Sequence, residues 1–328
     1  MTKFIGRQLQ VGVAREASRG GGAATPSIII PHVDFSFDDK VSRARLSPGL
    51  GKLADSEQAL VTNRYGQGDL NMDLRDQSIG YFLYSLLGTL STTGPTDSAY
   101  THAFSVSESV QHQSLALLVK DENITEEYKL AMVEQLEIVA TMDETVKAIV
   151  SFMSKKGEAW TNFSTALTDE NKFTKKHVTM KVAGAVGDLT AATAVSIKAL
   201  RLLIKQNLGL DDSLGTAEPE DILNHQLTVE GEVTLNYSDA TWKGYFRDPT
   251  DRAMEIKLVQ NDATIGAGTN PPLTIRMPKV DFHTWDANYA LDEIVTQTLS
   301  FKASYDVANT LNIISTCDLV NAKTAYTS

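Results

Sequence analysis

The segment Gly68-Asp69-Leu70-Asn71-Met72-Asp73-Leu74 is the stretch that decides how the chain folds. Its apolar residues alternate with polar ones, and alternate side chains of a β-strand point to the same face. Leu70, Met72 and Leu74 would therefore face a core, while Asp69 and Asp73 would face outward. The pattern predicts a half-buried strand with one acidic face.

A short helix is expected directly after this strand, over residues 77–87. Ile79, Leu83 and Leu87 recur there at helical spacing. Asp76 is a residue type that caps helix N-termini, and Gly88 is suited to end the helix. Further strands are expected at residues 33–37, 100–106 and 114–119, and within 128–153 with a break near 142–143.

Two segments lack such a pattern. Residues 19–26 are rich in glycine, so we expect residues 1–30 to form an N-terminal arm. Residues 38–59 are polar and contain Pro48-Gly49 and Gly51, which predicts a long loop. Loops of this length inside compact domains are often functional, or become ordered on a partner.

The chain also repeats itself. Gly231-Glu232-Val233-Thr234-Leu235-Asn236-Tyr237-Ser238-Asp239 has the same glycine, acid, aliphatic residue and final aspartate as residues 68–76. Residues 118–121 are echoed by 258–261, and residues 143–152 by 292–301. Three echoes in the same order indicate a duplicated domain with insertions in the first copy. Residues 193–207, which fit a helix or a strand, then correspond to 33–37 and are expected to be a strand. The alternative is that alternating strands simply resemble one another.

The composition limits the possible functions. With 328 residues, 42% of them hydrophobic, the chain can build one large domain or two ordinary ones. The net charge of −11 argues against a protein that grips nucleic acid, because such proteins neutralise phosphates with clustered Lys and Arg. It is compatible with a surface that repels DNA. The single Cys317 excludes an internal disulfide.

Motifs of catalytic chemistry are missing from the sequence. The six histidines do not have metal-ligand spacing. Gly49-Leu50-Gly51-Lys52-Leu53 lacks the first glycine and the final Ser or Thr of a phosphate-binding loop. We therefore expect no enzymatic activity, no cofactor and no metal site.

Three stretches carry a family resemblance: Gly12-Val13-Ala14-Arg15-Glu16 with Arg19-Gly20, Pro31 to Lys40, and Asp281-Phe282-His283-Thr284-Trp285 followed by Asp292 to Thr298. They resemble the tail tube proteins of siphophages, and the resemblance covers nearly the whole chain. It implies a mostly β fold with a minor helix, in two tandem tail-tube-like antiparallel β-sandwich or barrel domains, each with a short flanking helix. We expect an arm at 1–30, a first domain at 31–175 with the loop 38–59, and a second domain at 176–328.

The resemblance also implies a function. Subunits of this family form rings whose sheets line a lumen, and the rings stack into the tube of a long non-contractile tail, the conduit for DNA ejection into the host. Since the usual ring has six domains, two copies per chain imply a pseudo-hexameric homotrimer, with a hexamer as the alternative. Implied partners are the tape measure protein and DNA in the lumen, and terminator and baseplate or hub proteins at the ends, with no membrane. The implied location is the virion, after assembly in the host cytoplasm.

Two sets of residues would carry this function. The candidates for lining the lumen are Asp69, Asp73 and Glu232, although a solvated outer surface would explain them equally well. The candidates for contacts between rings lie in the arm and the loop: Arg15, Glu16, Arg19, Lys40, Arg43, Arg45 and Lys52. Alternative functions for the whole chain are a tail hub or terminator, a secretion-tube-like component, and a β-sandwich binding module.

Overall fold

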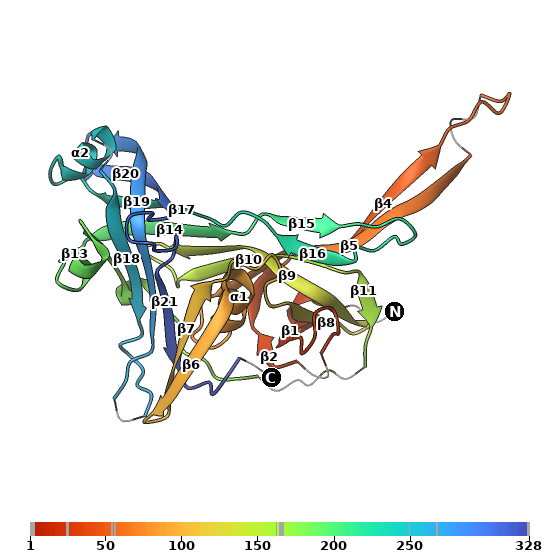
Figure 1. The fold of residues 1–328 in the computed structure, drawn as a ribbon, viewed down its shortest axis with the longest axis horizontal. Helices are drawn as coiled ribbons and strands as arrows, with labels where there is room; N and C mark the ends of the chain where they lie inside the picture. Colours follow the sequence, from red (N-terminus) through yellow and green to blue (C-terminus); the bar gives the residue numbers. More distant parts are fainter. Residues whose placement is uncertain are drawn as a thin grey trace.

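The protein is built mainly of antiparallel β-strands, with two short α-helices among the described residues. The computed structural model describes residues 4–23, 26–53, 55, 57–161, 163, 167–248, 250–266 and 268–326. Figure 1 shows an elongated molecule from which one hairpin, made by β4 (Asp38–Leu46) and β5 (Gln58–Asp73), projects at one end. Within the described ranges, no helix is long and apolar enough to cross a membrane.

Eight strands form one continuous antiparallel sheet, which we call the shared sheet. Hydrogen-bonded neighbours follow the order β3, β5, β10, β9, β14, β17, β20 and β19. The bounds of these strands are His32–Phe35, Gln58–Asp73, Lys147–Ser154, Thr125–Ala140, Ile197–Lys205, Thr228–Asn236, Thr296–Ser304 and Pro272–Asn288. In β10 buried and half-buried residues alternate strictly, so one face of this sheet covers the core and the other is open.

A second layer covers the core, and the long strands β9 and β19 belong to both layers. The first part of β9 pairs with β8 (Leu115–Lys120) and β11 (Gly157–Ala159), and β8 continues to β1 (Gln10–Arg15) and β2 (Ile28–Ile30). The first part of β19 pairs with β18 (Arg252–Val259) and β21 (Thr316–Asn321). Further strands extend this second group: β12 (Val178–Ala183), β13 (Ala194–Val195), β7 (Ala99–Val106) and β6 (Gly88–Thr96).

The shorter elements complete the fold. Helices α1 (Ile79–Leu87) and α2 (Thr241–Arg247) each follow the strand that carries the repeated glycine-acid motif. The 3-10 helices are Gly6–Gln8, Lys175–His177 and Val186–Thr190. Gly88 ends α1 with a φ of 87°, as expected for a left-handed C-terminal residue. The expected cap by Asp76 is wrong: Ser78 occupies the N-cap, while the Asp76 carboxylate accepts hydrogen bonds from Asn171.

The same arrangement of strands occurs twice, residue by residue. In the first copy Gly68 of β5 lies opposite Phe152 of β10, and in the second Gly231 of β17 lies opposite Phe301 of β20. The order β1, β8, β9, β10, β5, β3 in the first copy is matched by β12, β18, β19, β20, β17, β14 in the second. The strands expected at 33–37 and 193–207 are present and occupy equivalent places.

Irregularities in strand pairing also recur at equivalent positions. The β3–β5 ladder skips one residue between His32 and Asp34, and the β14–β17 ladder skips one between Ile197 and Ala199. The β9–β10 and β19–β20 ladders are likewise both interrupted, beside Phe152 and beside Phe301. Because a bulge re-aims its strand locally, coincident bulges show that the two copies share curvature as well as topology.

The two copies are joined edge to edge where β9 pairs with β14. The pairs run from Leu200 opposite Ala140 to Lys205 opposite Gln135. On the open face, the Arg201 guanidinium contacts the Glu137 carboxylate at 2.5 Å across this junction. The apolar clusters of both copies form one core, so the copies pack together as well as pairing.

Two of the expected irregular segments are in fact ordered by strand pairing. The expected arm contains β1, whose Val11 and Val13 are fully buried, and β2, whose three isoleucines are buried. The expected loop 38–59 is largely a hairpin, because β4 (Asp38–Leu46) pairs with the first half of β5. Both strands of the hairpin are exposed on both faces, so no apolar alternation marks them in the sequence.

Candidate assembly surfaces

The open face of the shared sheet carries the three residues expected to line a lumen. Asp69 and Asp73 alternate with the buried Leu70 and Met72 on β5. Glu232 is exposed on β17, between the buried Gly231 and Val233. All three carboxylates therefore lie on one face, the face turned away from the core.

Four cations on this face are already paired with carboxylates of the same chain. Lys147, Arg201 and Lys302 each contact a carboxylate at 2.5–2.7 Å, and Lys205 contacts one at 4.0 Å. Lys302 lowers the pKa of Glu230 by its hydrogen bond. By contrast, no described cation forms an ion pair with Asp69, Asp73 or Glu232. These three carboxylates therefore contribute negative charge to this face that no ion pair with a described residue neutralises.

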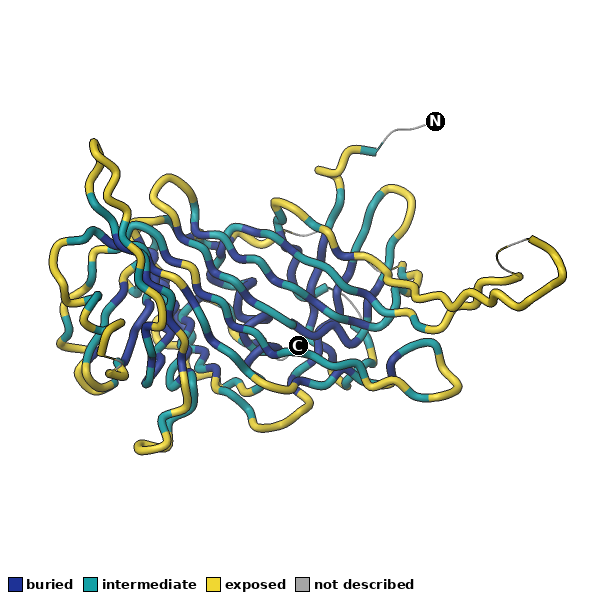
Figure 2. The backbone as a smooth tube through the Cα atoms, turned by 90° about the horizontal axis from the view of Figure 1, so that it is seen from above, coloured by how far each residue is buried: buried dark blue, intermediate teal, exposed yellow. Residues whose placement is uncertain are grey.

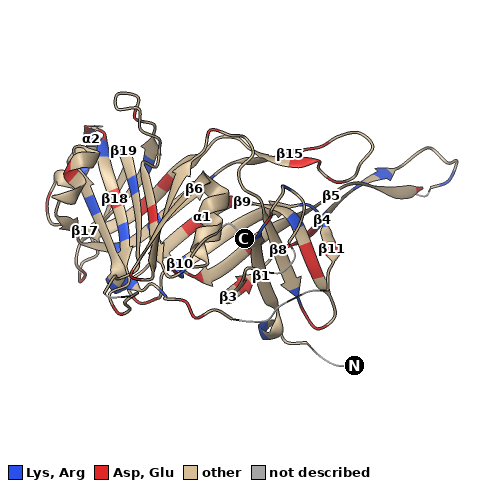
Figure 3. Ribbon diagram, turned by 60° about the horizontal axis from the view of Figure 1, so that its bottom comes forward, with Lys and Arg blue, Asp and Glu red and all other residues tan. Residues whose placement is uncertain are grey.

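A second candidate surface is the projecting hairpin, which we define as β4, the turn and residues 58–65 of β5. Figure 2 shows it as an exposed extension beyond the body of the protein. Lys40, Arg43 and Arg45 lie on β4 and Lys52 lies in the turn; all four are exposed, and none forms an ion pair with a described residue. Leu53 is also fully exposed at the tip, and Leu50 is 45% exposed. Figure 3 shows basic positions along this hairpin and acidic ones on β15 (Leu208–Asp211).

The second copy has a matching hairpin that folds back instead of projecting. It is formed by β15 (Leu208–Asp211) and β16 (Asp221–Asn224), between β14 and β17. Its Ile222 packs with Leu130 and Met132 of β9, which belongs to the first copy. The two hairpins thus occupy equivalent places in the repeat but differ in what they contact.

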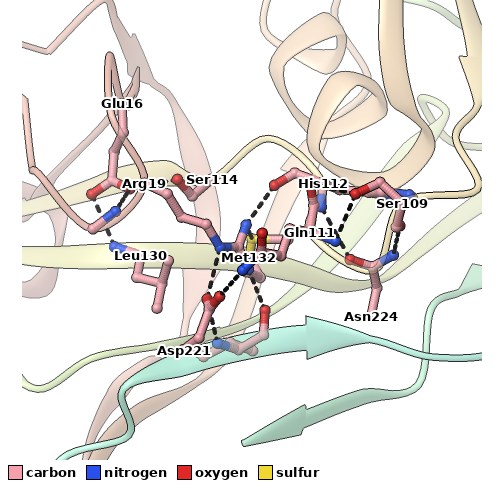
Figure 4. Close-up of polar contacts among 12 residues, drawn as sticks. Glu16, Arg19, Ser109, Gln111, His112, Ser114, Leu130, Met132, Asp221 and Asn224 are labelled. Carbon is pink, nitrogen blue, oxygen red and sulfur yellow. Dashed lines mark hydrogen bonds and ion pairs between the residues drawn. The ribbon is translucent and has the colours of Figure 1, made fainter. Parts of the chain in front are cut away.

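Arg19 holds the folded-back hairpin to the first copy (Figure 4). Its Nε lies 2.7 Å from Asp221 Oδ1, and its guanidinium also donates to the carbonyl oxygens of His112, at 2.5 Å, and Ile222. Gln111 donates to the second Asp221 oxygen at 2.6 Å. Arg19 was expected at a contact between rings; in the structure its charge is satisfied by a contact between the two copies.

Glu16 is also used within the chain. It is 1% exposed, and its carboxylate accepts hydrogen bonds from the amides of Gly20, Gly22 and Leu130 and from Ser114 Oγ. A buried carboxylate with four donors has no surface to offer a second ring. The neighbouring Arg15 donates to Gln113 at 3.0 Å. Of the seven residues expected between rings, the four on the projecting hairpin remain available.

Buried polar groups elsewhere support the fold. His102 lies between Thr92 and Asn321 in a hydrogen-bonded network, and burial lowers its pKa. Cys317 is fully buried on β21, and burial raises the pKa of its thiol. Within the described part of the chain, no group of three or more His, Cys, Asp or Glu residues is placed to hold a metal ion.

Sequence reasoning missed the folded-back hairpin and its attachment to Arg19. Arg19 and Asp221 are about 200 residues apart in the chain, and no local pattern connects them. The glycines near Arg19 suggested an arm, but Gly20 and Gly22 serve as amide donors to Glu16. Only the tertiary structure brings these residues together.

Comparison with known proteins gives one result. The sequence model of a family described as phage tail tube protein matches residues 6–303 of the chain. None of the curated proteins matches the sequence of this chain. The matched range contains both copies of the strand arrangement and both hairpins.

Proposed function

Because the chain belongs to the phage tail tube protein family, we propose that three copies close into a ring of six similar lobes, and that such rings stack into the tail tube of a long non-contractile tail. The tube would conduct DNA into the host during ejection. Other copies of the chain, the tape measure protein and DNA in the lumen, and terminator and baseplate or hub proteins at the ends would be its partners. Rings would assemble in the host cytoplasm and persist in the virion.

The observation that carries this proposal is the edge-to-edge junction of β9 with β14. It makes one chain into two ring-forming units with equivalent strands. The shared sheet still ends in two edges: among the described residues, no strand pairs with the outer edge of β3, or with residues 281–288 of β19 on the side away from β20. Unpaired edges invite pairing with another chain, and closure of a sheet removes them.

The open face of the shared sheet would line the lumen. Asp69, Asp73 and Glu232 lie on this face and form no ion pair with any residue that the structure describes, while several of its cations are neutralised within the chain. DNA binding depends on free Lys and Arg that replace the counterions of phosphates. A wall with unpaired negative charge would therefore let DNA pass without holding it.

The projecting hairpin would make contacts between rings. It continues β5 beyond the end of the shared sheet, so it extends along the strand direction and past the rim of the ring. Its exposed Arg43, Arg45 and Lys52 would meet acidic surface on the next ring. Since only the first copy carries it, each ring would present three such hairpins rather than six.

The domain boundaries also follow from the repeat. We propose that the first domain begins at β1, not at residue 31, because β1 is the counterpart of β12. The second domain then begins with β12, close to the expected residue 176.

Electron microscopy of the purified recombinant protein tests the proposal. Class averages down the ring axis should show six similar lobes from three chains, and side views should show stacked rings. Six chains in each ring would keep the tube and refute the trimer. Single rings that never stack would favour a terminator or hub, and particles that remain monomeric at high concentration would refute ring assembly.

A further inference from the structure

We infer that the β9–β14 junction inside the chain is the template for the junction between chains, so that β19 of one copy pairs with the β3–β4 edge of the next copy in a defined register. The inference rests on the proposed ring and goes beyond it by naming the residues that meet. It commits to a second copy of this chain as the partner of both free edges.

The first step is the equivalence of β9 and β19. Val133 and Phe282 hold the same place, because they lie opposite the equivalent Phe152 and Phe301. Both ladders resume after the shared interruption, and three pairs further along Glu137 corresponds to Asp286. The outer edge of β9 is occupied by β14, whereas no strand in the described part of the chain pairs with the same edge of β19.

The second step is the equivalence of β14 with the continuous edge made by β3 and β4. Leu200 corresponds to Phe35, since they pair with the equivalent residues Val233 and Leu70. At the far end, Lys205 corresponds to Lys40 by the same test. The match therefore spans the boundary between β3 and β4.

Combining the two steps fixes the register between chains. Inside the chain, Leu202 lies opposite Ile138 and Arg201 opposite Val139. The equivalent pairs between chains are Phe37 with Ala287 and Ser36 with Asn288. Asp38 then lies opposite Asp286, and Lys40 opposite Thr284.

The side chains on the core face fit this register. Inside the chain, two large aliphatic residues meet, Ile138 and Leu202. Between chains the large Phe37 would meet the small Ala287, so the summed side-chain volume of the pair is about the same as inside the chain. Phe37 already packs edge-on against Tyr128, at a centroid distance of 4.8 Å, so the small Ala287 can approach without moving the ring.

On the open face, the register puts two carboxylates opposite each other. Leu203 lies opposite Glu137 inside the chain, but Asp38 would lie opposite Asp286 between chains. Like charges directly opposite in a sheet are unfavourable, so the junction between chains should be the weaker of the two. Lys40, two residues from Asp38, is the nearest cation on the same edge and offsets part of the repulsion.

The test is disulfide cross-linking of assembled rings. The variant Ser36→Cys with Asn288→Cys places cysteines at an expected opposite pair, where the Cα separation of antiparallel partners suits a disulfide. Both native residues are exposed, and Cys317 is fully buried and should not interfere. After oxidation, a non-reducing gel should show the chain converted into a closed three-chain species, which reduction returns to a single chain.

Matched variants control for register and for chemistry. Val139→Cys with Arg201→Cys occupies the template position and should cross-link within one chain at any concentration. Ser36→Cys with Asp286→Cys is displaced by two residues, beyond the reach of a disulfide, and should yield about tenfold less cross-linking. Each single cysteine should give no closed species.

The outcomes separate this inference from the proposed ring. If rings are seen by electron microscopy and the template pair links, but Ser36→Cys with Asn288→Cys does not, the register is wrong and the ring stands. A stronger link from the displaced pair also overturns the register. If no rings form at all, both the ring and the inference fail.

Discussion

Removing the Arg19 guanidinium should release the folded-back hairpin without unfolding the protein. Arg19→Met keeps an aliphatic stem next to Met132 and deletes the contacts to Asp221 and to two carbonyl oxygens. Hydrogen bonds to charged groups contribute about 1.5–3 kcal/mol each. The side chains of Arg19 and Asp221 are 21% and 16% exposed, so solvent screening reduces the sum. We expect the docked hairpin to lose about 2–3 kcal/mol in total.

Hydrogen exchange of peptides covering residues 208–224 measures this loss directly. A change of about 2–3 kcal/mol in local opening corresponds to exchange that is about 30- to 150-fold faster. The core strand β10 should be unaffected, and Arg43→Met, which removes an exposed cation of the projecting hairpin, should leave residues 208–224 unchanged. Unchanged exchange in Arg19→Met would refute the role of Arg19 as the attachment. Equal acceleration throughout the chain would show instead that Arg19 supports the whole fold.

Three further predictions concern packing, pH and assembly. Gly231→Ala should lower the free energy of unfolding by about 1–3 kcal/mol, because a Cβ there would press on the Arg201 carbonyl and the Phe301 ring. Thermal unfolding checks this. In the control Gly244→Ala the added Cβ meets open space inside α2, so the free energy of unfolding should stay the same or rise by up to about 1 kcal/mol. Burial raises the pKa of Glu170 above its unfolded value. The contribution of Glu170 to the free energy of unfolding is therefore fully present below about pH 4.3, and it is lost as the pH rises through the raised pKa, because the buried site disfavours the charged carboxylate. Urea unfolding across this window should therefore show a smaller loss of stability in Glu170→Gln than in the native chain, and parallel curves would exclude Glu170 as the source. Asp286→Asn should let rings form at lower protein concentration, since it removes a charge expected opposite Asp38; sedimentation velocity measures this, and unchanged or weaker assembly would count against that facing pair.

The strands that cover the core were predictable because each has one buried face. Residues 68–74 and their echo at 231–239 alternate between apolar and polar side chains, and both form strands followed by a helix. The equivalence of residues 193–207 with 33–37 resolved an ambiguous segment, because the repeat supplies information that a local window does not contain.

The remaining features depend on contacts that no local pattern records. Residues 38–46 pair as a strand but bury neither face, so their sequence has no reason to alternate. The glycine-rich segment near Arg19 is ordered by the buried carboxylate of Glu16, whose other partners lie about 100 residues away. For the assembly surfaces, sequence placed Asp69, Asp73 and Glu232 on strands, but only the shared sheet shows that they lie on the same face.

The junction of β9 with β14 also has a kinetic consequence. It forms as the chain folds, because its two strands belong to one molecule and stay at a high effective concentration whatever the protein concentration. A ring built from such chains has three junctions between molecules instead of six, and every second junction is already formed before two molecules meet. Dilution would thus disperse the ring into pairs of lobes rather than into single ones. The protein concentration at which a tube begins to grow would be set by one kind of contact between chains, the pairing of β19 with the β3–β4 edge.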